Sequence, residues 1–293
     1  MTWLDVDDNE SLLLPGIAAR TAELLLHLEG SLSLPCVDEV VLPPVETNPC
    51  KDAEFALVVL GDGSVGAFYT WNDSASPGLV PDLRQAIRGR SACEFLKDID
   101  HSEDDRRAFA SGVLNALSQS VMKRAGLKLE SSTSLGGMCF DSGDRVGLVG
   151  LFPSLVRQFL GVGVDFVVIE RKQALLNPEA GYEISLDPAR LKDCNKVLIT
   201  GSTLLNRSLD EVLHHCRHAS RVAVIGPTAS CLPDMAFAAG VHSMGGIVVR
   251  DLPSLLKRQG NGAGWGDAVD KYLLDADSYP GFELLAERLQ GGE

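Results

Sequence analysis

The sequence predicts an α/β protein in which a parallel-sheet domain, residues 136–293, follows a small α+β domain, residues 1–135. Two observations support this fold class. An apolar strand from Arg145 runs into a glycine-rich turn and a helical segment, and a second apolar strand then ends on Glu170. Nucleotide-binding βαβ units begin in this order. Strands and helices also alternate through most of the remaining chain, which is typical of a parallel sheet with right-handed crossovers.

The first domain combines helical periodicity with short strands. Its predicted elements are a helix over 13–30, strands over 37–42, 55–60 and 67–71, and a helix over 105–125. Gly30 and Gly126 are placed to end the two helices. The run from Gly61 to Gly63 predicts a hairpin turn between the second and third strands. Apolar residues of the second helix lie on one broad face, which indicates that this helix covers a core.

A polar, glycine-rich stretch from Ser131 to Asp144 marks the predicted domain boundary. After it, the predicted strands cover 145–150, 164–169, 196–200, 221–225 and 246–249. The predicted helices cover 153–161, 208–218, 233–239 and 251–259. The tail from Trp265 shows two weak helical patterns.

Composition excludes several classes of partner. The chain has 293 residues, 45% of them hydrophobic, which indicates a globular protein with substantial cores. Its net charge is −14, and residues 1–140 hold 11 Lys and Arg against 21 Asp and Glu. Such a surface repels phosphate backbones and anionic lipids, so we expect neither nucleic acid nor membrane as a partner.

We expect a cytoplasmic protein. No apolar run reaches the ~18 residues of a membrane span, and the first residues lack the basic start of a secretion signal. The seven cysteines are odd in number and widely scattered, so they do not suggest a disulfide framework. A homodimer is the common default for such a protein.

The loop with Gly147, Gly150, Phe152 and Pro153 differs from the dinucleotide fingerprint. That fingerprint keeps side chains away from a pyrophosphate at a helix N-terminus. Here an aromatic residue and a proline stand where the helix begins, and the proline removes one amide. A ligand without phosphates, such as S-adenosylmethionine, would tolerate this better than NAD. The glycines could alternatively serve only close contact between strand and helix.

Glu170 ends the second strand of the βαβ unit, about 20 residues after the glycine loop, where an acid accepts hydrogen bonds from a ribose diol. Alternatively, it is a surface acid that pairs with Arg171 or Lys172. Asp187 is a second candidate for ligand binding, although Asp187-Pro188 could equally cap a helix.

The strand over 196–200 is followed by hydroxyl and amide side chains. The candidate ligand contacts here are Thr200, Gly201, Thr203 and Asn206. Such groups can orient a ligand by hydrogen bonds without charge. Alternatively, the segment only begins a helix, because Ser208 and Glu211 have the spacing of a capping box.

Two further groups are weaker candidates. Gly226 and Pro227 form a tight turn after the next strand, which could form the floor of a pocket or be a plain turn. His214 and His218 would share one face of a helix and could bind a metal. However, no Glu stands at the usual place between them, any third ligand must come from elsewhere, and histidines also favour the last turn of a helix.

With these residues identified, the second half of the chain resembles the putative heavy-metal chelation domain family, formerly a domain of unknown function. The matching segments are Val146–Pro153, Val168–Glu170, Val197–Asn206, Val224–Thr228, Gly240–Val241 and Gly245–Val249. The resemblance implies a Rossmann-like domain. These segments contain no Cys or His, so they show no chelating cluster.

The first half is similar to that family's usual companion, a domain with the fold of the enolase N-terminal domain. The segments Gly66–Thr70 and Gly112–Leu117 carry this similarity. It implies a site in the cleft between the two domains, to which Tyr69 and Asn115 would contribute as substrate contacts. Asn115 could alternatively be a buried amide that bonds loop backbone.

Three hypotheses follow. The first is an enzyme that binds S-adenosylmethionine and transfers or cyclises an alkyl or aminoalkyl group, with a link to metals through a metallophore or related metabolite. The second is an NAD-dependent oxidoreductase. The third is a non-catalytic protein that binds a heavy metal or metal complex, with Cys216, His214 and His218 as weak candidates. We favour the first. The crowded loop suits a ligand without phosphates, and the acidic first domain suits a cationic ligand such as S-adenosylmethionine.

Overall fold

The computed structural model describes residues 15–44, 54–70, 86–132, 136–176 and 181–291. The chain forms a three-stranded sheet and a seven-stranded sheet with helices around both. This confirms the predicted class, a parallel-rich α/β domain preceded by a small α+β unit.

The smaller sheet is an antiparallel meander of β1 (Val37–Val41), β2 (Phe55–Leu60) and β3 (Val65–Tyr69). Gly63, at φ 78°, makes the hairpin turn between β2 and β3. The helices of this unit are α1 (Ile17–Glu29), α3 (Cys93–Leu96) and α4 (Asp104–Arg124). α4 is buried continuously from Arg107 to Met122, so it has contacts on all sides.

The larger sheet is mixed, with strand order β10-β9-β8-β7-β4-β5-β6. Its strands are β4 (Arg145–Val149), β5 (Asp165–Ile169), β6 (Glu183–Ser185), β7 (Lys196–Thr200), β8 (Arg221–Ile225), β9 (Ser243–Val249) and β10 (Val269–Asp275). All neighbours pair in parallel except β9 and β10, which are antiparallel. The strand order reverses between β4 and β7, and open α/β sheets bind ligands outside the carboxyl ends of the strands at such a point.

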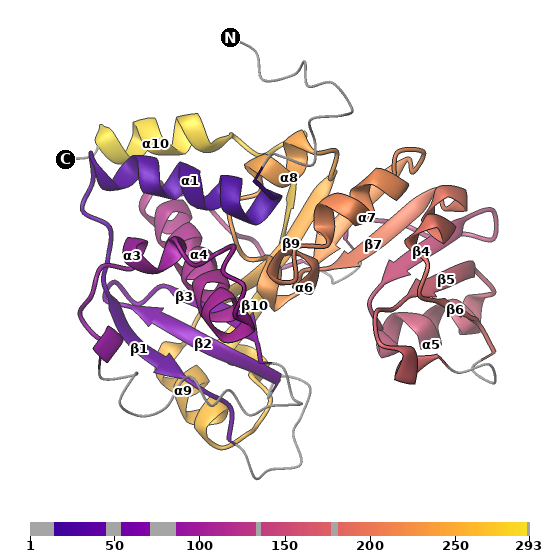
Figure 1. Ribbon diagram of the computed structural model, residues 1–293, viewed down its shortest axis with the longest axis horizontal. Helices are drawn as coiled ribbons and strands as arrows, with labels where there is room; N and C mark the ends of the chain where they lie inside the picture. Colours follow the sequence, from indigo (N-terminus) through magenta and orange to yellow (C-terminus); the bar gives the residue numbers. More distant parts are fainter. Residues whose placement is uncertain (1–14, 45–53, 71–85, 133–135, 177–180, 292–293) are drawn as a thin grey trace.

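The helices of the second unit connect these strands, except α10, which follows the last of them. They are α5 (Pro153–Val162), α6 (Ser202–Leu205), α7 (Leu209–His215), α8 (Asp234–Ala238), α9 (Leu252–Gly260) and α10 (Phe282–Gln290). In Figure 1, β4, β5, β6 and α5 form one side of the molecule, and the smaller sheet with α4 forms the other.

The tail differs in part from its prediction. Its second helical pattern forms α10, but the first forms β10. The buried residues Ala268 and Tyr272 lie four positions apart, which imitates the spacing of a helix. Seven residue pairs with β9 decide the outcome, because a strand beside an existing sheet edge satisfies its backbone groups there. Neither β6 nor this pairing was predicted.

The two units share cores. One face of the smaller sheet, with Val58 and Phe68, contacts α4, and the same cluster continues into the larger sheet at Val149 and Ile199. The opposite face of β2 and β3 contacts residues that follow the predicted boundary, namely Ile247, Leu255 and Trp265. The smaller sheet therefore lies between α4 and α9, and its second layer comes from the C-terminal part of the chain.

Among the described residues, no helix has the length and apolar character needed to cross a bilayer.

Candidate functional site

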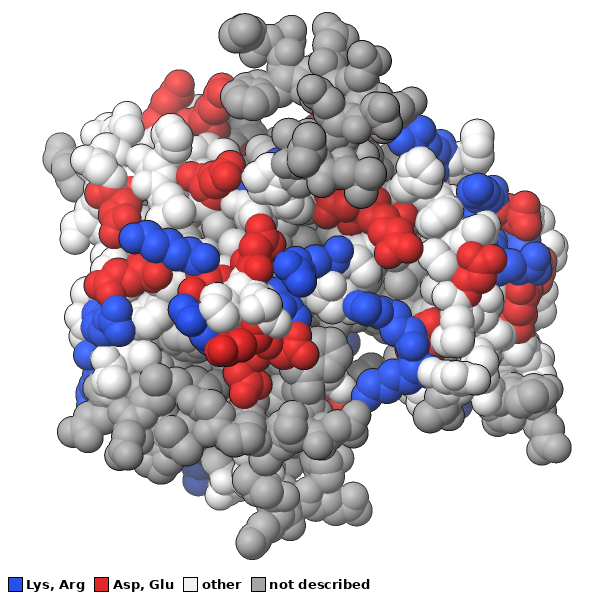
Figure 2. All heavy atoms as spheres, viewed as in Figure 1, with Lys and Arg blue, Asp and Glu red and all other residues white. Residues whose placement is uncertain are grey.

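A cleft of about 1390 Å³ lies between the two units, along the carboxyl ends of β4, β5, β7 and β8. It includes the point where the strand order reverses. Figure 2 shows the molecule hollowed between its two sides, with Lys and Arg side chains along one rim. The sequence-predicted residues that line it are Tyr69, Gly150, Phe152, Pro153, Glu170, Thr200, Thr203, Asn206, Gly226 and Pro227.

The two glycines of the first loop have different surroundings. Gly150 lines the cleft at φ 90°, and a Cβ there would lie 2.9 Å from Cγ2 of Thr200. Glycine at this position therefore lets the ends of β4 and β7 meet. Gly147 lies within β4, where a Cβ would lie 2.5 Å from Cδ2 of Leu191. The absence of a side chain at Gly147 lets Leu191 pack against the face of β4. Gly147 does not line the cleft.

Phe152 and Pro153 begin α5 at the edge of the cleft. Phe152 is the N-cap residue and gives the helix no side-chain cap, while Pro153 occupies the first turn. Both features match the crowded helix start that distinguished this loop from the dinucleotide fingerprint.

Glu170 follows β5 and faces the glycine loop. Burial raises the pKa of its carboxyl, while backbone hydrogen bonds from Arg171 and Leu151 and the charge of Lys172 act in the opposite direction. The amide of Arg171 lies 3.3 Å from Oε2. The carboxylate thus lies between the loops that follow β4 and β5. An acid in this place can accept hydrogen bonds from a ligand hydroxyl group.

The segment after β7 forms a compact turn. The hydroxyl of Thr203 donates to the carbonyl of Thr200 at 2.7 Å. Gly201 is buried, and a Cβ there would lie 2.7 Å from the amide nitrogen of Ala229. The absence of a side chain at Gly201 therefore lets this segment pack closely against the turn after β8. Gly201 does not line the cleft.

The predicted capping box does not form. Ser208 is the N-cap residue of α7, but its side chain does not cap the helix. Instead its hydroxyl donates to Oδ1 of Asn206 at 2.6 Å, and its amide donates to the same oxygen at 3.1 Å. The amide side chain of Asn206 captures the hydroxyl because it lies only two residues away.

The turn with Gly226 and Pro227 forms part of the cleft wall, and α4 fixes the residues that follow it. Asn115 donates to the carbonyls of Ala67 at 2.9 Å and Thr228 at 3.2 Å. One turn further along α4, Gln119 donates to the carbonyl of Ser230 at 2.9 Å. Two amide side chains from the first unit thus position this wall of the second.

Asn115 itself lies behind the cleft. It is buried, does not line the cleft, and bonds loop backbone, as the alternative interpretation predicted. Its Oδ1 atom has no hydrogen-bond partner among the described residues. Tyr69 does line the cleft, where its ring meets that of Phe55 edge to face.

Asp187 caps a short helix, as its alternative interpretation predicted. Its Oδ1 accepts a hydrogen bond from the amide of Ala189 at 2.9 Å. Asp187 does not line the cleft, although both of its neighbours in sequence do.

His214 and His218 are exposed and do not share a helix, because α7 ends at His215. Among the described residues, no group of three or more His, Cys, Asp or Glu side chains is arranged to hold a metal ion.

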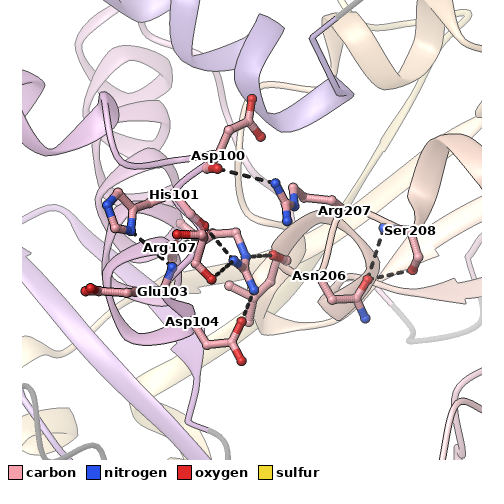
Figure 3. Close-up of polar contacts among 11 residues, drawn as sticks. Asp100, His101, Glu103, Asp104, Arg107, Asn206, Arg207 and Ser208 are labelled. Atoms are coloured by element: carbon pink, nitrogen blue, oxygen red, sulfur yellow. Dashed lines mark hydrogen bonds and ion pairs between the residues drawn. The ribbon is translucent and has the colours of Figure 1, made fainter. Parts of the chain in front are cut away.

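Sequence reasoning missed several charged residues of the cleft, among them Asp104, Arg107 and Arg207. Arg107 is buried on α4 and donates to the carbonyl of Leu205 in the second unit at 2.9 Å. Figure 3 shows Asp104, Arg107 and Arg207 together with Asp100 and His101, whose backbone carbonyls accept hydrogen bonds from the two arginines. Arg107 stands seven residues before Leu114, so it lies on the buried stripe of the helix. That spacing is the signal by which Arg107 could have been found. However, Arg107 stands in a run of charged residues, which is typical of a solvent-exposed helix end.

Comparison with known proteins supports the family resemblance. Residues 137–274 match the family described as "Putative heavy-metal chelation", which confirms the recognition made from the motifs of the second domain. An uncharacterized protein of Methanocaldococcus jannaschii is 30% identical over 92 residues. This match covers 31% of the present chain and 35% of that protein, so the chain spans about a third of this curated relative.

Two solved structures have a similar fold over most of the chain. One is a DUF364-family protein of unknown function from Pyrococcus horikoshii, 17% identical, with a TM-score of 0.65 over 89% of this chain and 100% of that chain. The other is a DUF364-family protein of unknown function from Desulfitobacterium hafniense, 18% identical, with a TM-score of 0.66 over 87% and 98%. At these identities the likeness shows the fold.

Proposed function

We propose that this protein, whose residues 137–274 match the family described as "Putative heavy-metal chelation", binds an adenosyl ligand in the cleft between its two units. The favoured ligand is S-adenosylmethionine, from which the protein transfers or cyclises an alkyl or aminoalkyl group. One observation carries the proposal: the half-buried Glu170 follows β5 beside the glycine loop, at the sheet edge where such folds bind nucleosides.

The cleft residues suggest a division of roles. Glu170 would accept hydrogen bonds from the ribose diol. Gly150, which lines the cleft beside Thr200, would let the ligand approach the backbone at the end of β4. Thr200 and Asn206 line the same cleft and would bind the adenine or the second substrate. Pro153 in the first turn of α5 removes an amide that a pyrophosphate would use, which favours a ligand without phosphates.

The chemistry would then be a displacement at a carbon attached to the sulfonium. The lone pair of the nucleophile forms a bond to that carbon while the carbon–sulfur bond breaks. Its electrons return to sulfur, which leaves as a neutral thioether. The protein's part would be to hold the two groups in line. A product that itself binds metal would link this reaction to the name of the family.

Titration with S-adenosylmethionine, S-adenosylhomocysteine, methylthioadenosine and NAD tests the proposal. Calorimetry and thermal shift should show saturable binding of the adenosyl-sulfur compounds. Replacement Glu170→Gln should weaken that binding at least tenfold, about 1.4 kcal/mol. Glu283→Gln, an exposed acid on α10, removes the same charge outside the cleft and should leave the affinity unchanged.

Binding of NAD alone would replace this proposal by the oxidoreductase hypothesis. Unchanged affinity in Glu170→Gln would remove this carboxylate from the site.

A further inference from the structure

The side of the cleft formed by α4 and by the turn after α6 carries two arginines beside Asp104, and the adenosyl proposal leaves these arginines without a role. Arg107 and Arg207 both line it. Arg107 comes from the first unit, and Arg207 comes from the second. The charge on this side therefore depends on both units.

The two guanidinium groups donate to neighbouring backbone carbonyls. Arg107 donates through Nη1 to the carbonyl of His101 at 2.6 Å. Arg207 donates through Nη1 to the carbonyl of Asp100 at 3.3 Å. Because these two carbonyls belong to consecutive residues, the groups converge on one stretch of backbone. Figure 3 shows both arginines beside this stretch. An anion bound between the two guanidinium groups would be attracted by both.

Arg207 adopts a backbone conformation that its residue type disfavours. Its φ is 61°, and it is the one non-glycine residue with positive φ in the described part of the chain. Hydrogen bonds of Ser208 to Asn206 brace the turn on either side. Strained backbone of this kind persists where the surrounding structure maintains it, and such positions cluster at ligand-binding sites. Because the Arg207 side chain lies in the cleft despite this unfavourable backbone conformation, we infer that it has a function there.

Asp104 shows which ligand chemistry suits Arg107. Its carboxylate contacts Nη2 of Arg107, yet its own side chain is 62% exposed. Asp104 also lines the cleft. An exposed carboxylate on the outer edge of a buried guanidinium can swing away, and a ligand oxyanion can then take its place. Because backbone carbonyls hold Nε and Nη1 of Arg107, the oxyanion would bind through Nη2, and a guanidinium N–H suits carboxylate and phosphate alike.

We propose that Arg107 and Arg207 form a subsite for the oxyanion, a carboxylate or a phosphate, of the second substrate. The subsite lies in the cleft but is separate from the Glu170 end. This inference rests on the proposed function for its assignment to a second substrate. Oxyanion binding itself does not depend on the adenosyl ligand.

The test is calorimetric titration of the whole protein with inorganic phosphate and with succinate, at an ionic strength balanced with chloride. The wild-type protein should bind at least one of them saturably. Arg207→Gly should bind it at least tenfold more weakly. The same variant should melt no lower than wild type, because glycine accepts the positive φ. Loss of affinity then cannot reflect loss of folding.

Two companion variants sharpen the test. Asp104→Asn removes the carboxylate that competes for Arg107, so it should tighten oxyanion binding several-fold. Arg288→Gln, at an exposed position on α10, removes a positive charge far from the cleft and should change nothing. Absence of saturable binding by wild type, full affinity in Arg207→Gly, or equal loss in Arg288→Gln would each overturn the subsite.

The outcomes also separate this subsite from the adenosyl proposal. Arg207→Gly should bind S-adenosylmethionine and methylthioadenosine as wild type does. Weaker binding of S-adenosylmethionine alone would assign the arginines to the carboxylate of that ligand and overturn the second-substrate assignment. Saturable oxyanion binding in a protein that binds no adenosyl compound would overturn the proposed function and leave the oxyanion site standing.

Discussion

Asp144 stabilises the edge of the larger sheet opposite the cleft. Its carboxylate accepts hydrogen bonds from Nζ of Lys196 at 2.7 Å, from Nδ2 of Asn195 at 2.9 Å and from the amide of Asp141 at 2.9 Å. Burial alone would raise the pKa of this carboxyl, but these hydrogen bonds and the charge of Lys196 lower it below the usual 3.8. The residue thus joins the starts of β4 and β7.

We predict that Asp144→Asn lowers the free energy of unfolding at neutral pH by about 1–3 kcal/mol, because hydrogen-bonded partners lose a charged acceptor. A carboxyl with a lowered pKa contributes stability above its unfolded pKa and loses it as pH falls through the folded pKa. The difference between wild type and variant should therefore shrink below about pH 4. Urea titrations across pH measure both effects.

Asp165→Asn is the matched control. Asp165 pairs with Arg145 at the same end of the sheet but is 62% exposed, and exposed ion pairs contribute about 0–1 kcal/mol. A cost as large as that of Asp144→Asn would show that burial of Asp144 is not the cause. Neither change should alter ligand binding at the opposite edge.

At the scale of elements, close contact between β3 and α4 sets the position of the cleft. A Cβ on Gly66 would lie 2.1 Å from the carbonyl oxygen of Gly112 and 2.3 Å from the amide nitrogen of Ala116. A Cβ on Gly112 would instead meet Cδ1 of Phe68 at 2.4 Å. The first obstacle is backbone and the second is a side chain.

Gly66→Ala should therefore destabilise the protein more than Gly112→Ala, because a ring can turn but a helix backbone must move as a whole. Overpacking changes of this kind cost about 1–3 kcal/mol or more. Gly30→Ala, where no heavy atom lies within 4 Å and φ is −72°, should be neutral or stabilising. Denaturant midpoints compare the three, and equal costs at Gly66 and Gly112 would contradict the argument.

At the scale of the whole molecule, the smaller sheet depends on α9. Phe55 of β2 and Leu255 of α9 lie in one buried cluster with Trp265. Gln259 of α9 donates to the carbonyl of Phe55 at 2.7 Å and accepts from the indole of Trp265 at 2.7 Å. Residues far apart in the sequence thus share one buried cluster.

We predict that the two units unfold in a single transition. Trp3 and Trp71 lie outside the described residues, so both are replaced by Phe to leave Trp265 as the fluorescent reporter. Fluorescence and far-ultraviolet circular dichroism should then give the same midpoint. Leu255→Ala should lower the free energy of unfolding by about 2–5 kcal/mol, and both midpoints should fall together. Two separate transitions would show that residues 1–135 fold independently.

The sequence by itself determined the fold class, most strand positions and the residues around the glycine loop. These follow from local patterns: apolar runs make buried strands, and glycine at the strand end makes a tight turn at Gly150. Parallel strands then bring their carboxyl ends to one edge, so Glu170, Thr200 and Gly226 were predicted to gather there, and all three line the cleft.

Other features depend on contacts between residues distant in the sequence, and only the tertiary structure decided them. β10 forms because an edge of β9 was available for pairing. Gly147 and Gly201 serve close contact within the fold, since the neighbours they accommodate are distant in sequence. Arg107 faces the cleft because α4 is enclosed by both units, whereas its local sequence suggests a solvated helix end. Which side chains are buried, and which come together at the cleft, depends on contacts between segments far apart in the sequence. Local sequence patterns carry no information about those contacts.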